Sequence, residues 1–241
     1  MYIKKRIETI FHRVIRKTGY DVIKCKYFKH EQEIEQLLNY LHIGCVLDVG
    51  ANEGQYAKII RIGGYKNRII SFEPIKEPFM KLKQISANDS LWDIYNIALG
   101  NFNGETEINI AGNSQSSSIL EINAAHINAA PESKYIGKEI VEIHTMDSLF
   151  KELNVSDQPV FMKIDTQGFE KNVLLGAKST LKSIKAVQLE MSVQPLYKGE
   201  ELYYQLSDYL YLEGFRLIKI IRGLTKNDGE LLQFDGVFMR D

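Results

Sequence analysis

The sequence predicts an α/β domain built on a doubly wound, mainly parallel sheet. Short apolar runs rich in Val and Ile alternate with stretches of helical periodicity from residue 45 onward. The runs lack the apolar–polar alternation of a half-exposed strand, which is typical of parallel strands covered by helices on both faces. The last two runs predict an antiparallel pair at the C-terminus, so the expected sheet has seven strands.

The expected elements follow one another in a regular order. The helix after the first strand stops at Gly63 and Gly64, because glycine commonly ends helices. Strands are expected at 45–50, 68–74, 92–99, 159–165, 184–191, 215–222 and 231–240. Helices are expected at 55–64, 76–86, 169–181 and 201–214. Two further strands, 104–112 and 138–146, flank a polar stretch without a steady apolar period.

The chain is expected to form one Rossmann-like domain, residues 43–241, with a helical extension at residues 1–42. Residues 101–145 form a strand and loop insertion within that domain. Its polar stretch, residues 112–137, is long for a compact domain, and loops of this length are usually functional or mobile. We therefore expect this stretch to act as a mobile lid over the site.

The beginning of the chain combines apolar residues at helical spacing with many Lys and Arg residues. A helix of this kind packs on its own domain or on a second subunit, which we favour. The alternative is peripheral contact with an anionic membrane surface. The pattern does not fix the oligomeric state, and a dimer is one outcome.

Composition excludes several classes of protein. The chain has 30 Lys and Arg against 31 Asp and Glu, which gives no electrostatic basis for binding nucleic acid. Two cysteines, Cys25 and Cys45, cannot make a disulfide framework. There is neither a secretory signal nor an apolar run of about 18 residues, so a cytoplasmic location is expected.

The turn after the first strand carries the pattern Asp48-x-Gly50-x-Asn52-x-Gly54. A dinucleotide fingerprint laid from Gly50 would need glycine at Asn52 and at Gln55, which argues against NAD or FAD. The turn still offers free backbone N–H groups at a helix start, which suit a carboxylate. Asp48 adds an acid beside the turn that could hold an ammonium group of the ligand. A ligand with a carboxylate, an ammonium and a ribose is S-adenosylmethionine.

The ends of the next two strands support the same cofactor. Glu73 ends the second strand about 20 residues after the turn, where an acid can accept hydrogen bonds from both ribose hydroxyls. Asn96, Ile97 and Ala98 end the third strand, where an adenine edge would lie. The glycines and the two acids at this spacing together predict S-adenosylmethionine binding.

These residues also carry a resemblance to the FkbM-type family of class I S-adenosylmethionine-dependent methyltransferases. Eight stretches occur in the family's order: LDVGANEGQYA, SFEP, NIALGNFNGE, SSSIL, TMDSL, KIDTQGFEKNVLLGA, VQLEMSVQPLYKGE and LLQFDGVFMR. They span residues 46–240 and leave the first 42 residues outside. The family motif often reads Asp-x-Glu-Gly where this chain has Gln167, so the role of that charge does not carry over. The resemblance places Ser117 and Ser118 near the cofactor.

A hydroxyl acceptor needs its proton removed during methyl transfer, or a metal that lowers its pKa. Asp165 ends a buried strand and is the first candidate base; a cap for the helix near Gly168 is the alternative. Lys163 points the same way as Asp165 and could pair with it or hold substrate. Glu190 is the second acid.

Two further groups belong to this reading of the site. His144 is a candidate general base, with a strand-surface histidine as the alternative, and Asp147 is expected to cap the helix that it begins. No metal is assigned; if Mg²⁺ is bound, its ligands are expected to be Asp165, Glu190 and Asp235.

The resemblance implies an O-methyltransferase for a hydroxyl of a sugar, a glycan or a glycosylated product, with a nucleotide-sugar among the acceptors and polysaccharide biosynthesis as the setting. A secondary-metabolite hydroxyl is the runner-up. Two alternatives come from other classes: a non-catalytic S-adenosylmethionine-binding module, and a dehydrogenase, which tight NAD binding would support.

Overall fold

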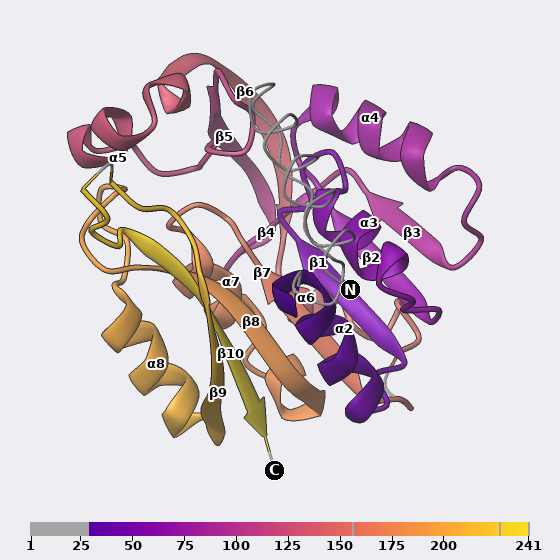
Figure 1. The fold of residues 1–241 in the computed structure, drawn as a ribbon. Helices are drawn as coiled ribbons and strands as arrows, with labels where there is room; N and C mark the ends of the chain where they lie inside the picture. Colours follow the sequence, from indigo (N-terminus) through magenta and orange to yellow (C-terminus); the bar gives the residue numbers. More distant parts are fainter. Residues whose placement is uncertain (1–28, 156, 227, 241) are drawn as a thin grey trace, which may run out of the picture.

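The computed structural model describes residues 29–155, 157–226 and 228–240, with side chains from residue 34 onward. Its centre is a seven-stranded sheet with the order β3-β2-β1-β7-β8-β10-β9 (Figure 1). β1, β2, β3, β7 and β8 are parallel, and β10 is antiparallel to both its neighbours. The predicted doubly wound sheet with a C-terminal antiparallel pair is confirmed. The strands are β1 (Cys45–Val49), β2 (Arg68–Phe72), β3 (Trp92–Tyr95), β7 (Val160–Ile164), β8 (Ile184–Ser192), β9 (Phe215–Arg222) and β10 (Gln233–Arg240).

Helices cover both faces of this sheet, which explains the continuous apolar strands. Every residue of β1 and β7 is buried. Cys45, Leu47 and Val49 of β1 face one apolar cluster, and Val46 faces the other. α7 (Glu170–Gly176) and α8 (Tyr203–Leu212) pack in the first cluster. α2 (Lys29–Tyr40), α3 (Gln55–Ile62) and α4 (Lys76–Ser86) pack in the second.

The strand expected at 92–99 is two strands in different sheets, which corrects the prediction. β3 ends at Tyr95, and β4 (Ala98–Leu99) joins a second sheet with the order β4-β6-β5. Asn96 makes the break, because its Nδ2 donates to the main-chain oxygens of Glu73 and Pro74 at 2.9 and 2.8 Å. The other strands of this sheet are β5 (Gly104–Ala111) and β6 (Tyr135–His144).

The polar stretch between β5 and β6 contains regular structure. It forms α5 (Ala124–Ala129) and a 3₁₀ turn, η2 (Pro131–Ser133). Antiparallel bridges join Asn109 to Ser118 and Ile122 to Tyr197. This stretch therefore packs against β5 and against the segment after β8.

Asp147 has a different role from the predicted helix cap. The residue that caps α6 (Met146–Leu149) is Thr145, whose side chain accepts a hydrogen bond from the Ser148 N–H. Asp147 instead accepts from the N–H groups of Ser179 and Thr180 at 2.9 and 2.7 Å, beside the 3₁₀ turn η3 (Thr180–Ser183). The carboxylate thus links the start of α6 to the segment before β8.

Gly50 allows the two central strands to end side by side. Its φ of +76° lies in the left-handed region, which favours glycine. A Cβ at this position would lie 1.9 Å from the main-chain oxygen of Asp165. The turn after β1 therefore touches the end of β7, and this close approach brings the glycine turn and the predicted catalytic acid together.

The expected N-terminal extension is only partly described. α2 packs on the domain through Ile34 and Leu38, whereas the amphipathic segment proposed for membrane contact lies outside the described residues. Across the described parts of the chain, no helix has both the length and the apolar character needed to cross a membrane.

Candidate active site

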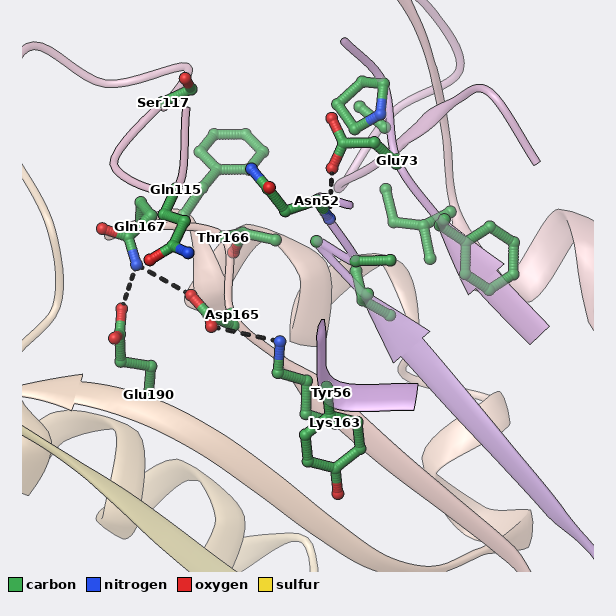
Figure 2. A pocket seen from close by; sticks show the side chains of 18 of the residues that line it. Asn52, Tyr56, Glu73, Gln115, Ser117, Lys163, Asp165, Thr166, Gln167 and Glu190 are labelled. Carbon is green, nitrogen blue, oxygen red and sulfur yellow. Dashed lines mark hydrogen bonds and ion pairs between the residues drawn. The ribbon is translucent and has the colours of Figure 1, made fainter. Parts of the chain in front are cut away.

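A cavity of about 300 Å³ opens at the carboxyl ends of the central strands (Figure 2). Open α/β sheets bind ligands at this edge, where the strand order reverses. The segment after β5 forms part of its wall through Ser114, Gln115, Ser117 and Ile119. The polar lining includes predicted residues from five strands: Asn52 after β1, Glu73 after β2, Lys163 and Asp165 at β7, Glu190 on β8 and Asp235 on β10.

Glu73 holds the turn after β1 against the end of β2. Its carboxylate accepts hydrogen bonds from the N–H groups of Asn52 and Ile75, both at 2.8 Å. Asn52 has a positive φ of 48°, and its Nδ2 donates to Ser114 Oγ at 3.1 Å. Burial raises the pKa of Glu73 to about 7, although the two N–H groups act in the opposite direction. The Glu73 carboxyl group therefore lies at one end of the cavity, and its oxygens can accept further hydrogen bonds.

The structure corrects the role expected for Asp48. Its side chain is fully buried in β1 and does not line the cavity. Ser71 Oγ donates to Asp48 Oδ2 at 3.1 Å, and Nζ of Lys163 lies 3.6 Å from Oδ1. Burial raises the pKa of Asp48, while the Lys163 ammonium opposes that shift. Asp48 is placed to pair with the lysine of this chain, not to touch a ligand's ammonium group.

Lys163 and Asp165 form an ion pair at the end of β7. Nζ of Lys163 lies 3.1 Å from Asp165 Oδ2 and 5.4 Å from the centre of the Tyr56 ring. Burial disfavours the ammonium form, but the carboxylates of Asp165 and Asp48 outweigh it and raise the pKa of Lys163. The Asp165 side chain is 33% exposed, so its carboxylate is paired on one side and open to the cavity on the other.

Asp165 is not the helix cap of the alternative interpretation. The turn that leads into α7 is held by Glu170, whose Oε1 accepts from the N–H groups of Thr166 and Gly168 at 2.8 and 3.2 Å. Burial raises the pKa of Glu170 to about 7. The Asp165 carboxylate instead pairs with Lys163 and accepts a hydrogen bond from Gln167.

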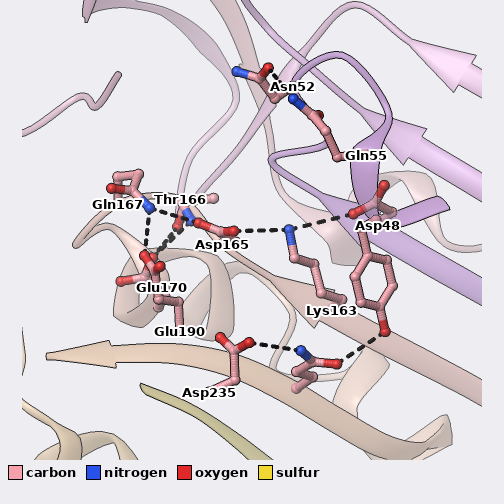
Figure 3. A network of polar contacts seen from close by, with 12 residues as sticks. Asp48, Asn52, Gln55, Lys163, Asp165, Thr166, Gln167, Glu170, Glu190 and Asp235 are labelled. Carbon is pink, nitrogen blue, oxygen red and sulfur yellow. Dashed lines mark hydrogen bonds and ion pairs between the residues drawn. The ribbon is translucent and has the colours of Figure 1, made fainter. Parts of the chain in front are cut away.

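Gln167 is a site residue that sequence reasoning missed, although its departure from the family motif marked the position. Its Nε2 donates to Asp165 Oδ1 at 2.8 Å and to Glu190 Oε2 at 2.5 Å (Figure 3). Its Oε1 accepts from the Tyr197 hydroxyl at 2.6 Å. One amide therefore joins the ends of β7 and β8 to the segment after β8.

Glu190 and Asp235 each accept a hydrogen bond from a side-chain amide. Gln188 Nε2 donates to Asp235 Oδ2 at 3.1 Å, and Gln233 Nε2 donates to Glu190 Oε2 at 3.2 Å. Burial, reinforced by neighbouring carboxylates, raises the pKa of Glu190 well above its ordinary range and that of Asp235 to about 6. Within the described residues, no group of three or more His, Cys, Asp or Glu side chains is arranged to hold a metal ion, so the Mg²⁺ alternative is not supported.

Besides Asp48, four predicted site residues lie outside the cavity lining. His144 ends β6, and its Nε2 lies 2.6 Å from Glu142 Oε1, so it is the strand-surface histidine of the alternative interpretation. Ser118 is buried, and its Oγ donates to the main-chain oxygen of Gln167 at 2.7 Å. Gly54 begins α3 and packs toward Trp92. The fourth, Asn96, holds the main chain after β2.

The other predicted cofactor residues do line the cavity. Gly50 and Asn52 form its glycine turn, Ile97 and Ala98 form an apolar wall, and Ser117 lies on the covering segment. Tyr56 and Gln188 were not predicted; the Tyr56 hydroxyl donates to Gln188 Oε1 at 3.0 Å. Apolar surface at one end and acids at the other suit a ligand that is part aromatic and part polar.

Fold and site define a methyltransferase. Residues 48–217 match the methyltransferase FkbM domain. The chain therefore belongs to the FkbM family of class I S-adenosylmethionine-dependent methyltransferases, as predicted, which sets aside the dehydrogenase.

Similarity to individual proteins is lower. The 2-O-methyltransferase NoeI of Sinorhizobium fredii is 21% identical over 161 residues, which are 64% of this chain and 66% of that protein. The magnesium protoporphyrin IX methyltransferase ChlM of Synechocystis, solved with bound SAM, has a TM-score of 0.48 and 10% identity, covering 97% of each chain. The 1,6-didemethyltoxoflavin-N1-methyltransferase of Burkholderia thailandensis has a TM-score of 0.45 and 8% identity, covering 100% of this chain and 90% of that one. At this distance neither structure bears on the chemistry of the site.

The buried acids predict how stability changes with pH in the cofactor-free protein. Glu73 and Glu170 have pKa values of about 7, and Asp235 has one of about 6, against about 4 when unfolded. The folded state therefore binds more protons than the unfolded state between about pH 4 and pH 7. We expect the free energy of unfolding, measured in urea, to fall from pH 5 to pH 8. Each such carboxyl contributes up to about 1.4 kcal/mol per pH unit.

Asp235→Asn tests the assignment, because the amide keeps an oxygen for Gln188 and removes one titrating group. Its stability should fall less steeply between pH 5 and pH 6 than that of the unmodified protein. The raised pKa of Lys163 does not interfere, since its contribution is lost only above about pH 10. A stability that stays level or rises from pH 5 to pH 8 would contradict the prediction.

Proposed function

We propose that this protein is an O-methyltransferase that transfers the methyl group of S-adenosylmethionine to a hydroxyl of a sugar or glycan. The observation that carries the proposal is Asp165: a carboxylate paired with a buried ammonium on one side and open to the cavity on the other. Such a group can accept the proton of a hydroxyl as that hydroxyl attacks. Membership of the methyltransferase family supplies the reaction class.

The cavity fits the cofactor at the end opposite the acid pair. Within the described part of the chain, Glu73 accepts two hydrogen bonds, both from backbone N–H groups, so its oxygens can still accept from the ribose hydroxyls. Ile97 and Ala98 offer an apolar face for adenine. Gly50 leaves backbone room for the amino-acid part of the ligand. When bound, S-adenosylmethionine supplies a methyl group on a sulfonium.

The residues of this chain then align and deprotonate the acceptor. S-adenosylmethionine would supply the methyl group to the acceptor oxygen, and Asp165 would take the proton that the acceptor hydroxyl releases. The ammonium of Lys163, 3.1 Å from Oδ2, holds the Asp165 carboxylate in place beside the acceptor. Placement of the acceptor in line with the methyl group supplies much of the acceleration.

The charges of the cavity favour a neutral acceptor. Its lining holds four carboxyl groups, Glu73, Asp165, Glu190 and Asp235, and Lys163 is the one cation among these lining residues. That ammonium is already shared by Asp48 and Asp165. The cavity lining therefore offers a phosphate-bearing nucleotide-sugar no unpaired cation as a partner. The similarity to the 2-O-methyltransferase NoeI supports methyl transfer to an oxygen.

Methyl-labelled S-adenosylmethionine with a panel of acceptors tests this function. The panel compares neutral oligosaccharides, nucleotide-sugars, uronic acids and small phenolic or polyketide alcohols. We expect label in neutral oligosaccharides, as a methyl ether that mass spectrometry places on a ring hydroxyl. Label confined to non-sugar alcohols would establish the secondary-metabolite alternative, and cofactor binding without transfer to any acceptor would favour a non-catalytic module.

Glu73→Ala should weaken S-adenosylmethionine binding by about 1–3 kcal/mol, the scale of lost hydrogen bonds to a charged group. Isothermal titration calorimetry measures the change. Glu77→Ala is the matched control, because Glu77 lies four residues further on, on α4, and its side chain is 82% exposed. Unchanged affinity in a folded Glu73→Ala protein would remove Glu73 from the cofactor site.

Asp165→Asn should lower turnover by about 10²–10⁴, the range for loss of a positioned general base. The amide has nearly the same size, so cofactor affinity should stay close to that of the unmodified protein. The melting temperature should fall somewhat. In the unmodified protein both carboxylate oxygens of Asp165 accept from donors, Lys163 and Gln167, and in the variant an NH₂ group replaces one of these oxygens. Methyl transfer, calorimetry and melting temperature are measured on the same sample. Near-normal turnover would eliminate Asp165 as the base.

A further inference from the structure

We propose that Gln167 is the positioning residue that fixes the carboxylate of Asp165 for catalysis. The inference rests on the proposed role of Asp165 and adds a residue that acts through it. Gln167 lies beside Asp165 and Glu190 (Figures 2 and 3). Its amide nitrogen is 2.8 Å from Asp165 Oδ1, and its amide oxygen is 2.6 Å from the Tyr197 hydroxyl.

The chemistry of the three partners decides which way the amide points. Tyr197 is buried, and burial together with nearby carboxylates raises its pKa well above the ordinary range, so its hydroxyl keeps its proton and donates. That donor matches the amide oxygen. The two carboxylates can accept, and the NH₂ group supplies two donors. The reversed amide would place its oxygen against two carboxylates, so this orientation is the stable one.

The NH₂ group of Gln167 lies between the carboxyl groups of Asp165 and Glu190 and donates to both. Asp165 and Glu190 each accept one of its hydrogens, and no shared proton or bridging cation is needed between them. Where the family motif has glutamate, a third carboxyl would stand at this point. Ionisable groups surround Asp165 and Glu190 on the elements packed around them. These groups are Lys163 on β7, Asp48 on β1, Asp235 on β10 and Glu170 on α7.

The main chain holds Gln167 in place before any ligand binds. Gln167 has a positive φ of 55°, and its carbonyl accepts from the buried Ser118 hydroxyl at 2.7 Å. Gly168 follows with φ of +93°, and a Cβ there would lie 2.8 Å from Cβ of Tyr197. The loop is thus packed against the residue that holds the amide oxygen, and the side chain is preorganised.

This arrangement leaves Asp165 with one defined orientation. Oδ2 is held by Lys163 and Oδ1 by Gln167, so rotation of the carboxylate is restrained at both oxygens. The remaining lone pairs are available to an acceptor hydroxyl in the cavity. Without the amide donor, Asp165 would be held by Lys163 alone, and Oδ1 would lose the hydrogen bond that fixes its position.

Gln167→Met tests the inference, because methionine has a similar length and neither donates nor accepts these hydrogen bonds. We expect kcat to fall roughly 10- to 100-fold, the scale of a misplaced catalytic group. The cofactor Kd and the acceptor KM should stay within about threefold, because the residue touches neither ligand in this proposal. In the Asp165→Asn background, Gln167→Met should cause no further loss, because a positioning residue has nothing left to position.

Three outcomes distinguish the positioning role of Gln167 from the proposed role of Asp165 as the base. A slow Asp165→Asn enzyme with a normal Gln167→Met enzyme would overturn the positioning role and leave the proposed function standing. Normal turnover of Asp165→Asn would overturn the base assignment and, with it, the role of Gln167. Losses that multiply in the double variant would show that Gln167 acts independently of Asp165, which also overturns the inference.

Gln167→Glu provides a second variant if the methionine protein does not fold. It keeps an oxygen for Tyr197 but replaces the donor between the acids with a carboxyl group. Gln188→Glu is the matched control, since it adds a carboxyl to the same cavity against Asp235 instead of Asp165. We expect kcat to fall about tenfold more in Gln167→Glu than in Gln188→Glu. Equal losses would point to the added charge alone and overturn the inference.

Discussion

The site depends on one buried cation, the ammonium of Lys163. It stands 3.6 Å from Asp48 and 3.1 Å from Asp165, so it neutralises an acid in β1 and an acid at the end of β7. Burial raises the pKa of Asp48, and the Lys163 ammonium opposes that shift. Removing one partner of such a group leaves a buried charge and typically costs about 3–5 kcal/mol. The ion pair therefore ties the stability of the central strands to the charge state of the proposed base.

The same physics divides the remaining carboxyls into separate roles. Glu73 and Glu170 accept hydrogen bonds from backbone N–H groups, and so hold the turns after β2 and before α7. Glu190 and Asp235 are served by the side-chain amides of Gln167, Gln233 and Gln188. Amides keep these acids hydrogen-bonded without adding charge. Asp165 is the acid of this set that combines a cationic partner with exposure to the cavity, and that combination suits a base.

Much of the fold and part of the site could be predicted because they follow from strand geometry. Buried parallel strands give continuous apolar runs, and their carboxyl ends meet at one edge, which brings Glu73, Asp165 and Glu190 into one cavity. Other features depend on contacts that no periodicity reports. Asn96 splits a predicted strand through side-chain hydrogen bonds to carbonyls. His144 is attractive by residue type, yet it lies on the second sheet and outside the cavity.

Gln167 shows why a departure from a family motif is informative only with a structure. From the sequence, the change from glutamate to glutamine removes a charge and leaves its consequence open. In the fold, the position lies between two carboxylates and opposite a tyrosine hydroxyl, where an amide satisfies all three partners at once. A glutamate there would have to share a proton with its neighbours, and its effect would then depend on pH. The neutral amide makes the geometry of Asp165 independent of that proton, so the glutamine gives this chain a base whose position is set by hydrogen bonds.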